Sequence, residues 1–126
     1  MSERGSVTIV VAAVLAAGVV LAIGAADVTR VFAVAARAQT AADASALAAA
    51  QELAIPGVPE PTDVAREYAE RNGATLVACG CDRDTFVATV TVRLAVGPLL
   101  LFADDRVVEA SAKAVVDLPS FTPSPG

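Results

Sequence analysis

The stretch VTIVVAAVLAAGVVLAIGAA, from Val7 to Ala26, decides the fold. It carries no charge, and Thr8 is its only polar side chain. A helix rises about 1.5 Å per residue, so this run covers roughly 30 Å, the thickness of the hydrocarbon core of a bilayer. The run predicts a membrane-spanning helix, and residues 6–26 are taken as the transmembrane segment.

The helix is expected to continue beyond the apolar run. No proline precedes Pro56, and the alanine-rich residues 27–54 keep helix propensity high. Residues 27–55 therefore predict an extracytoplasmic continuation of the helix that ends before Pro56. Side-chain pairs are expected within it, at i, i+3 and i, i+4 spacing. These pairs are Asp27 with Arg30 and Gln39 with Asp43, and the predicted inward stripe is Val28, Val31, Ala35, Ala38, Ala42, Ala49 and Leu53.

Residues 1–5 (MSERG) form a short polar leader before this helix. Lysine and arginine counts on the two sides do not choose an orientation. The short leader has no folding role, whereas the rest of the chain carries a disulfide-capable pair, so we expect the C-terminal part outside the cell membrane. The alternative is a secreted binding or effector protein with residues 1–26 as a cleaved signal peptide. Against it, the apolar run exceeds the roughly 7 to 15 residues of a signal core.

Small residues line one face of the predicted span. Gly18, Ala22 and Ala26 follow one another at intervals of four residues. In lipid, such a stripe lets two helices approach closely, so this face is predicted to contact another copy of the chain or another membrane subunit. The alternative is that an alanine-rich span produces this spacing by chance.

Residues 56–117 predict a small α+β head. With about 60 residues the head is too small to bury a large core alone, so it is expected to use part of the long helix. Pro56, Pro59 and Pro61 form a stiff connector to a second helix, Thr62–Asn72, with Thr62 as its N-cap and Asn72-Gly73 as its stop. The predicted inward residues of this helix are Val64, Ala65, Tyr68 and Ala69.

Strand signals follow the second helix. A short apolar run covers Ala74–Cys79, and period-two alternation covers Thr85–Val96 and Arg106–Asp117, with a turn at residues 80–84. These patterns predict a three-stranded antiparallel sheet with one buried face. The alanines of the last strand suit a close approach by the alanine-rich part of the first helix. Predicted inward residues are Phe86, Ala88, Val90, Val92, Leu94, Val96, Val108, Ala110, Ala112, Ala114 and Val116.

The most apolar segment outside the predicted span is Gly97–Phe102 (GPLLLF). It is either a connection tucked under the sheet or a patch that touches a partner or the bilayer surface. Residues 118–126 are rich in proline and serine and are expected to be a disordered tail.

Composition argues against several function classes. The chain has no tryptophan and no histidine, and histidine is the commonest general base and metal ligand. Its net charge of −5 argues against binding to nucleic acid, whose phosphates call for a basic surface. No nucleophile-base pair, phosphate loop or dinucleotide fingerprint occurs. We therefore expect a non-enzyme with no cofactor, no metal and no small-molecule substrate. Asp82, Asp84, Asp104 and Asp105 have the positions expected of turn residues, without EF-hand spacing.

Cys79 and Cys81 are the reactive side chains that remain. A bridge within this CxC needs a bend, which Gly80 allows, so Cys79 and Cys81 form a candidate disulfide; bridging between subunits is the alternative. A redox or metal role is a further hypothesis, but two thiols without histidine or a third cysteine fall short of a zinc site.

The run RAQTAADASALAAA, from Arg37 to Ala50, together with Gly5 and the apolar helix, resembles TadE/TadG-like proteins of tight-adherence (Flp) pilus systems. In its short length and its CxC motif, the chain is similar to the small TadE-like proteins encoded beside secretion ATPases. The resemblance implies a pilin-like minor subunit or membrane-anchored assembly factor, with other subunits and membrane lipid as partners. It also implies prepilin-type processing between Gly5 and Ser6. Val10 occupies the position of the prepilin glutamate, which argues against a major pilin.

Overall fold

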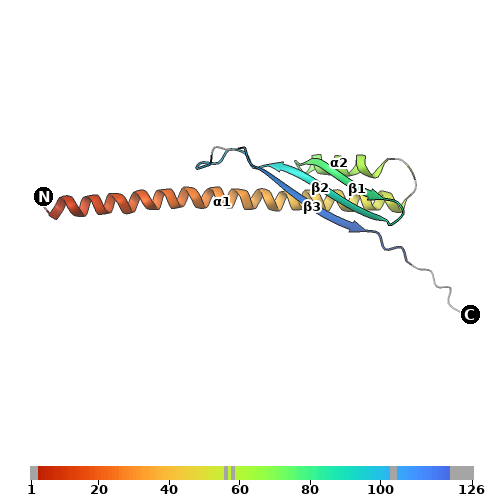
Figure 1. The fold of residues 1–126 in the computed structure, drawn as a ribbon, viewed down its shortest axis with the longest axis horizontal. Helices are drawn as coiled ribbons and strands as arrows, with labels where there is room; N and C mark the ends of the chain where they lie inside the picture. Colours follow the sequence, from red (N-terminus) through yellow and green to blue (C-terminus); the bar gives the residue numbers. More distant parts are fainter. Residues whose placement is uncertain (1–2, 56, 58, 103–104, 120–126) are drawn as a thin grey trace, which may run out of the picture.

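The structure is a computed structural model of the chain that describes residues 3–55, 57, 59–102 and 105–119. One long helix extends far beyond the rest of the fold, and a small sheet and a second helix cover only its C-terminal half (Figure 1). This α+β arrangement confirms the predicted fold class. In chain order the elements are α1 (Glu3–Ala54), α2 (Pro61–Arg71), β1 (Thr75–Asp82), β2 (Val87–Ala95) and β3 (Val107–Val115).

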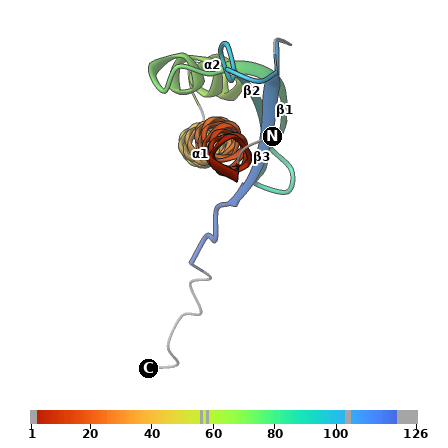
Figure 2. The same ribbon diagram turned by 90° about the vertical axis from the view of Figure 1, so that its left-hand side faces the viewer.

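The sheet is antiparallel, with the strand order β1-β2-β3. β1 pairs with β2 along its length, with a shift of register between Leu76 and Ala78. β2 pairs with β3 over all of Val87–Ala95. Both helices lie on one face of the sheet, so the head has two layers (Figure 2). The opposite face carries polar contacts such as the ion pair between Arg93 and Glu109 at 2.7 Å.

The core of the head lies between the C-terminal half of α1 and the sheet. Small side chains dominate it, and the half-buried Ala110, Ala112 and Ala114 of β3 pack against the alanines of α1. The head therefore borrows α1 for its core, as its size predicted. The buried members are Ala41, Ala42, Ala46, Ala49, Ala50, Leu53, Ala65, Ala69, Ala74, Ala88, Val90 and Val92.

Two predictions about the helices are wrong in detail. α2 begins at Pro61, and Glu60 is its N-cap, without a side-chain cap hydrogen bond. Proline suits the first helical position because its missing N–H would have no partner there, so Thr62 lies inside the helix. Tyr68, predicted to face inward, is exposed, and its ring lies 5.4 Å from the guanidinium of Arg71. The helix stops as predicted at Asn72, followed by Gly73 with φ +74°.

The sheet begins to bury α1 at a residue further along the chain than the sequence pattern predicted. Val28, placed in the inward stripe, is 53% exposed, whereas Ala38, Ala42 and Ala49 are fully buried. The reason is geometric: the sheet packs only on the part of α1 that follows. Residues 1–2 of the predicted leader, residues 56 and 58 of the predicted connector and residues 120–126 of the predicted tail lie outside the described residues.

The first strand is longer than predicted. β1 continues to Asp82, so Gly80 and Cys81 belong to the strand rather than to the turn, which covers residues 83–86. Asp82 closes this turn, because its carboxylate accepts hydrogen bonds from the backbone N–H of Asp84 at 2.9 Å and the hydroxyl of Thr85 at 2.7 Å. The predicted inward face of β2 is confirmed by the burial of Ala88, Val90 and Val92.

Candidate functional site

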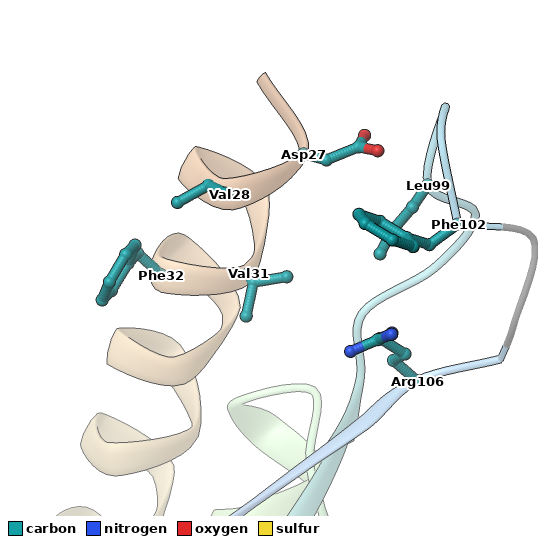
Figure 3. Close-up of a pocket in the computed structure, with 7 residues that line it drawn as sticks. All are labelled: Asp27, Val28, Val31, Phe32, Leu99, Phe102 and Arg106. Atoms are coloured by element: carbon teal, nitrogen blue, oxygen red, sulfur yellow. The ribbon is translucent and has the colours of Figure 1, made fainter. Parts of the chain in front are cut away.

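Asp27 is the first charged residue after the apolar run, and its side chain is buried, with 3% exposure. Its Oδ1 accepts a hydrogen bond from the backbone N–H of Leu100 at 2.9 Å, and its Oδ2 accepts one from Leu101 at 2.8 Å. Figure 3 shows the Asp27 carboxylate pointing from α1 toward the β2–β3 loop. The two bonds hold this loop against α1 at the end of the apolar run.

The hydrogen bonds also set the charge state of the carboxyl group. The backbone N–H of Leu100, and then that of Leu101, lowers the pKa of Asp27 below its usual 3.8, because both donors stabilise the ionised form. Burial opposes this shift, and the positive charge of Arg30 adds to it. Arg30 itself donates from Nη1 to the carbonyl oxygen of Pro98 at 2.6 Å. Asp27 and Arg30, predicted to pair with each other, each bind the loop instead.

The loop itself is strongly apolar. Leu99 is buried in a small cluster with Val34 and Val96. In contrast, Leu100, Leu101 and Phe102 are 71%, 46% and 50% exposed. Of the two alternatives for this segment, a connection tucked under the sheet is therefore wrong for these three residues. Figure 1 shows the reason: the loop extends beyond the sheet, along α1 toward its N-terminal end.

A small cavity of about 170 Å³ lies between α1 and the loop. Its lining is mostly apolar, and the guanidinium of Arg106 lies 5.2 Å from the centre of the Phe102 ring at one side of it. Such a lining suits an apolar group beside a cation and offers no paired nucleophile and base. The lining residues are Asp27, Val28, Val31, Phe32, Leu99, Phe102 and Arg106 (Figure 3).

The other candidate residues lie apart from this site. Cys79 and Cys81 lie on β1 with adjacent sulfur atoms and Cα atoms 5.4 Å apart, a separation within the disulfide range. Their oxidation stays a prediction, as does a redox role. Gly5 and Ser6 lie at the start of α1. Prepilin-type processing between them stays a prediction. The stripe Gly18, Ala22 and Ala26 is exposed on α1 and is a predicted helix-association face.

The acidic turn residues that the structure describes do not converge. Among the described residues, no three histidine, cysteine, aspartate or glutamate side chains come close enough to hold a metal ion. Asp82 is engaged in its own turn, as turn chemistry predicts. Asp104 lies outside the described residues.

The fold places this protein in a structural class with one long N-terminal helix. The apolar half of that helix is uncovered, and the other half contributes to the core of a small α+β head. Residues 5–52 match the Tad family, described as "Putative Flp pilus-assembly TadE/G-like". This match confirms the resemblance to TadE/TadG-like proteins, and it falls on α1. Tad is a pilus-assembly family and not a family of enzymes. No curated protein and no solved structure matches the chain.

Proposed function

We propose that this chain is a membrane-anchored, pilin-like minor subunit or assembly factor of a tight-adherence (Flp) pilus or a related secretion apparatus. It acts without catalysis. The apolar half of α1 anchors the chain and contacts neighbouring helices, and the rest of α1 holds the head outside the cell membrane. Its partners are membrane lipid and other subunits of the apparatus, including further copies of itself through Gly18, Ala22 and Ala26.

The uncovered half of α1 carries this proposal. The helix is long and apolar enough to cross a membrane, and its most apolar window is not buried by any other part of the fold. Leu15 and Leu21 are 65% and 73% exposed, in contrast to Leu53, which is 3% exposed in the core of the head. A helix that is apolar on all sides needs lipid or other helices around it. The family match over the same helix supports a place in a pilus-assembly apparatus.

The continuity of α1 supports an anchor that stays attached. The helix passes through Ala26 without a break, and the next residue is held by the β2–β3 loop. The part of α1 that forms the core of the head is thus the same continuous helix as the apolar run.

The test is to express the full chain with a C-terminal tag in a bacterium that assembles a Flp pilus. We expect the tagged chain in the membrane fraction, resistant to alkaline carbonate, with the tag accessible to protease added outside the cell. The mass of the mature chain should correspond to a start at Met1 or Ser6. A chain free in the medium that starts at Asp27 would instead identify a secreted protein.

A further inference from the structure

We propose that the β2–β3 loop is a second membrane contact, in which Leu100, Leu101 and Phe102 insert into the leaflet next to the head. This inference rests on the proposed anchoring of α1. It gives a lipid partner to three large side chains that the head leaves exposed. The loop then limits how far the head can tilt on its helix.

The position of the loop along α1 is the first reason. Asp27 binds the N–H groups of Leu100 and Leu101 at the first residue beyond the predicted span. The Cδ1 atom of Leu101 lies 3.5 Å from where a Cβ on Gly24 would stand, and Gly24 belongs to the apolar run. Leu101 therefore lies at the depth of the last turn of the span, where hydrocarbon meets the headgroups.

The chemistry of the loop is the second reason. Gly97–Phe102 contains no charged or polar side chain. Leu100 is the most exposed of its leucines, and Figure 1 shows that this segment lies beyond the end of the sheet on the side of the apolar half of α1. The loop is thus the part of the head closest to the proposed bilayer, and it is also the most apolar part.

Continuity with α1 favours lipid over a protein partner. Leu101 lies beside Gly24, so the exposed apolar surface of the loop continues into that of the span and one bilayer covers both. Two cations lie beside the loop: Arg30 donates to Pro98, and Arg106 lies over Phe102. Arginine beside an inserted apolar group is typical of the headgroup level, where its apolar stem is buried and its charge stays in water.

Tryptophan fluorescence tests this proposal directly, because the chain contains no tryptophan. Three full-length variants, Leu100→Trp, Val14→Trp and Val115→Trp, are each reconstituted into phosphatidylcholine vesicles with and without bromine on the acyl chains. All three positions are well exposed in the protein, so the larger ring fits without repacking. Val14 reports the span, and Val115, at the far end of β3, reports the part of the head remote from the loop.

We expect brominated lipid to remove most of the emission of the Val14→Trp and Leu100→Trp variants, and little of that of Val115→Trp. If Val14→Trp is quenched and Leu100→Trp is not, the loop proposal is overturned while the anchor stands. Unquenched emission from Leu100→Trp at a short wavelength would assign the loop to a protein contact instead. If Val14→Trp is not quenched, the proposed anchor fails and the loop proposal fails with it.

Discussion

At Asp27, one carboxylate accepts hydrogen bonds from two successive backbone N–H groups, one on each oxygen. The side chain is short and leaves α1 at the first residue after the apolar run, so the loop is held at a fixed height on the helix. Asparagine has nearly the same shape but offers only one acceptor oxygen. A single atom exchange therefore separates the effect of size from that of the paired hydrogen bonds.

Replacing Asp27 by asparagine should release the loop. One N–H of the pair, at Leu100 or Leu101, loses its acceptor and faces an amide NH₂ group, so protection of both amides from hydrogen exchange should fall by roughly tenfold or more. NMR-detected exchange on the full chain in bicelles measures this. The control is Asp43→Asn, which makes the same change of charge on an exposed residue that contacts Gln39. We call the two hydrogen bonds from Leu100 and Leu101 to Asp27 the Asp27 clamp, and equal protection in both variants would contradict it.

The same clamp should depend on pH. The pKa of Asp27 is lowered in the fold by the N–H groups of Leu100 and Leu101, so the ionised clamp contributes stability above the usual pKa of 3.8. That contribution is lost as the pH falls from 3.8 through the lower value in the fold. We expect the amide shifts of Leu100 and Leu101 to titrate together with a midpoint below 3.8. A midpoint at or above 3.8 would show that the bonds do not favour the charged form.

Ser45 is a polar residue that the fold does not use. It is fully buried in α1, and its hydroxyl has no hydrogen-bond partner among the described residues. Ser45→Ala removes this unpaired group and improves helix propensity, so it should raise the free energy of unfolding by about 1 kcal/mol. Urea unfolding of the full chain in detergent micelles measures the change. Ser111→Ala, which removes a 2.8 Å contact with Thr91, should bring no gain.

At the scale of elements, the small residues of α1 decide how closely the sheet packs. Ala46 is 1% exposed in the core, whereas its neighbour Leu47, about 100° further around the helix, is 58% exposed. The pattern is the reverse of a usual amphipathic helix, since the small residue faces inward. A core lined by alanine has no room for a longer side chain. The distance between the backbone of α1 and the sheet therefore depends on these alanine positions.

Exchanging sizes at these two neighbours tests this packing. Ala46→Leu should cost about 1 to 3 kcal/mol of stability through overpacking, whereas Leu47→Ala should stay within about 0.5 kcal/mol of the parent chain. Urea unfolding followed by circular dichroism measures both in the same detergent. Similar losses in the two variants would indicate that burial does not distinguish the two faces of α1.

The elements were predictable to the extent that local patterns encode them. Period-two alternation identified the inward face of β2, because Ala88, Val90 and Val92 repeat every second residue in a buried environment. The end of β1 was missed, because its glycine and aspartate also suit a turn. α2 starts earlier than predicted because proline and threonine are both good starting residues.

The clamp was not predictable from residue types. Asp27 is notable in the sequence as the first charge after the apolar run, and a partner four or fewer residues away is the natural expectation. Its partners are backbone N–H groups 73 and 74 residues later in the chain. Every non-proline residue carries such a group, so no pattern distinguishes Leu100 and Leu101 as donors. The apolar loop could be identified, but not the place at which it docks.

For the whole molecule, α1 has two environments along one continuous helix. The half before Asp27 is uncovered, and the half after Val34 supplies the alanines and Leu53 of the head's core. The sheet and α2 bury their inner faces on this second half, so the head has little core without it. The head is thus one folding unit with the second half of α1, and the apolar half continues from it as the same helix rather than through a linker.

Truncation tests this last point. Residues 56–126 alone lack the α1 side chains and are too few to bury a sufficient core, so we expect an unfolded chain with narrow amide dispersion in the NMR spectrum. Residues 25–126 keep Asp27 and the second half of α1, and should give a dispersed spectrum with protected β2 amides. The longer fragment serves as the control for loss of the apolar half. A folded 56–126 fragment would show that the head does not depend on α1 for its core, and that the helix only connects the head to the apolar segment.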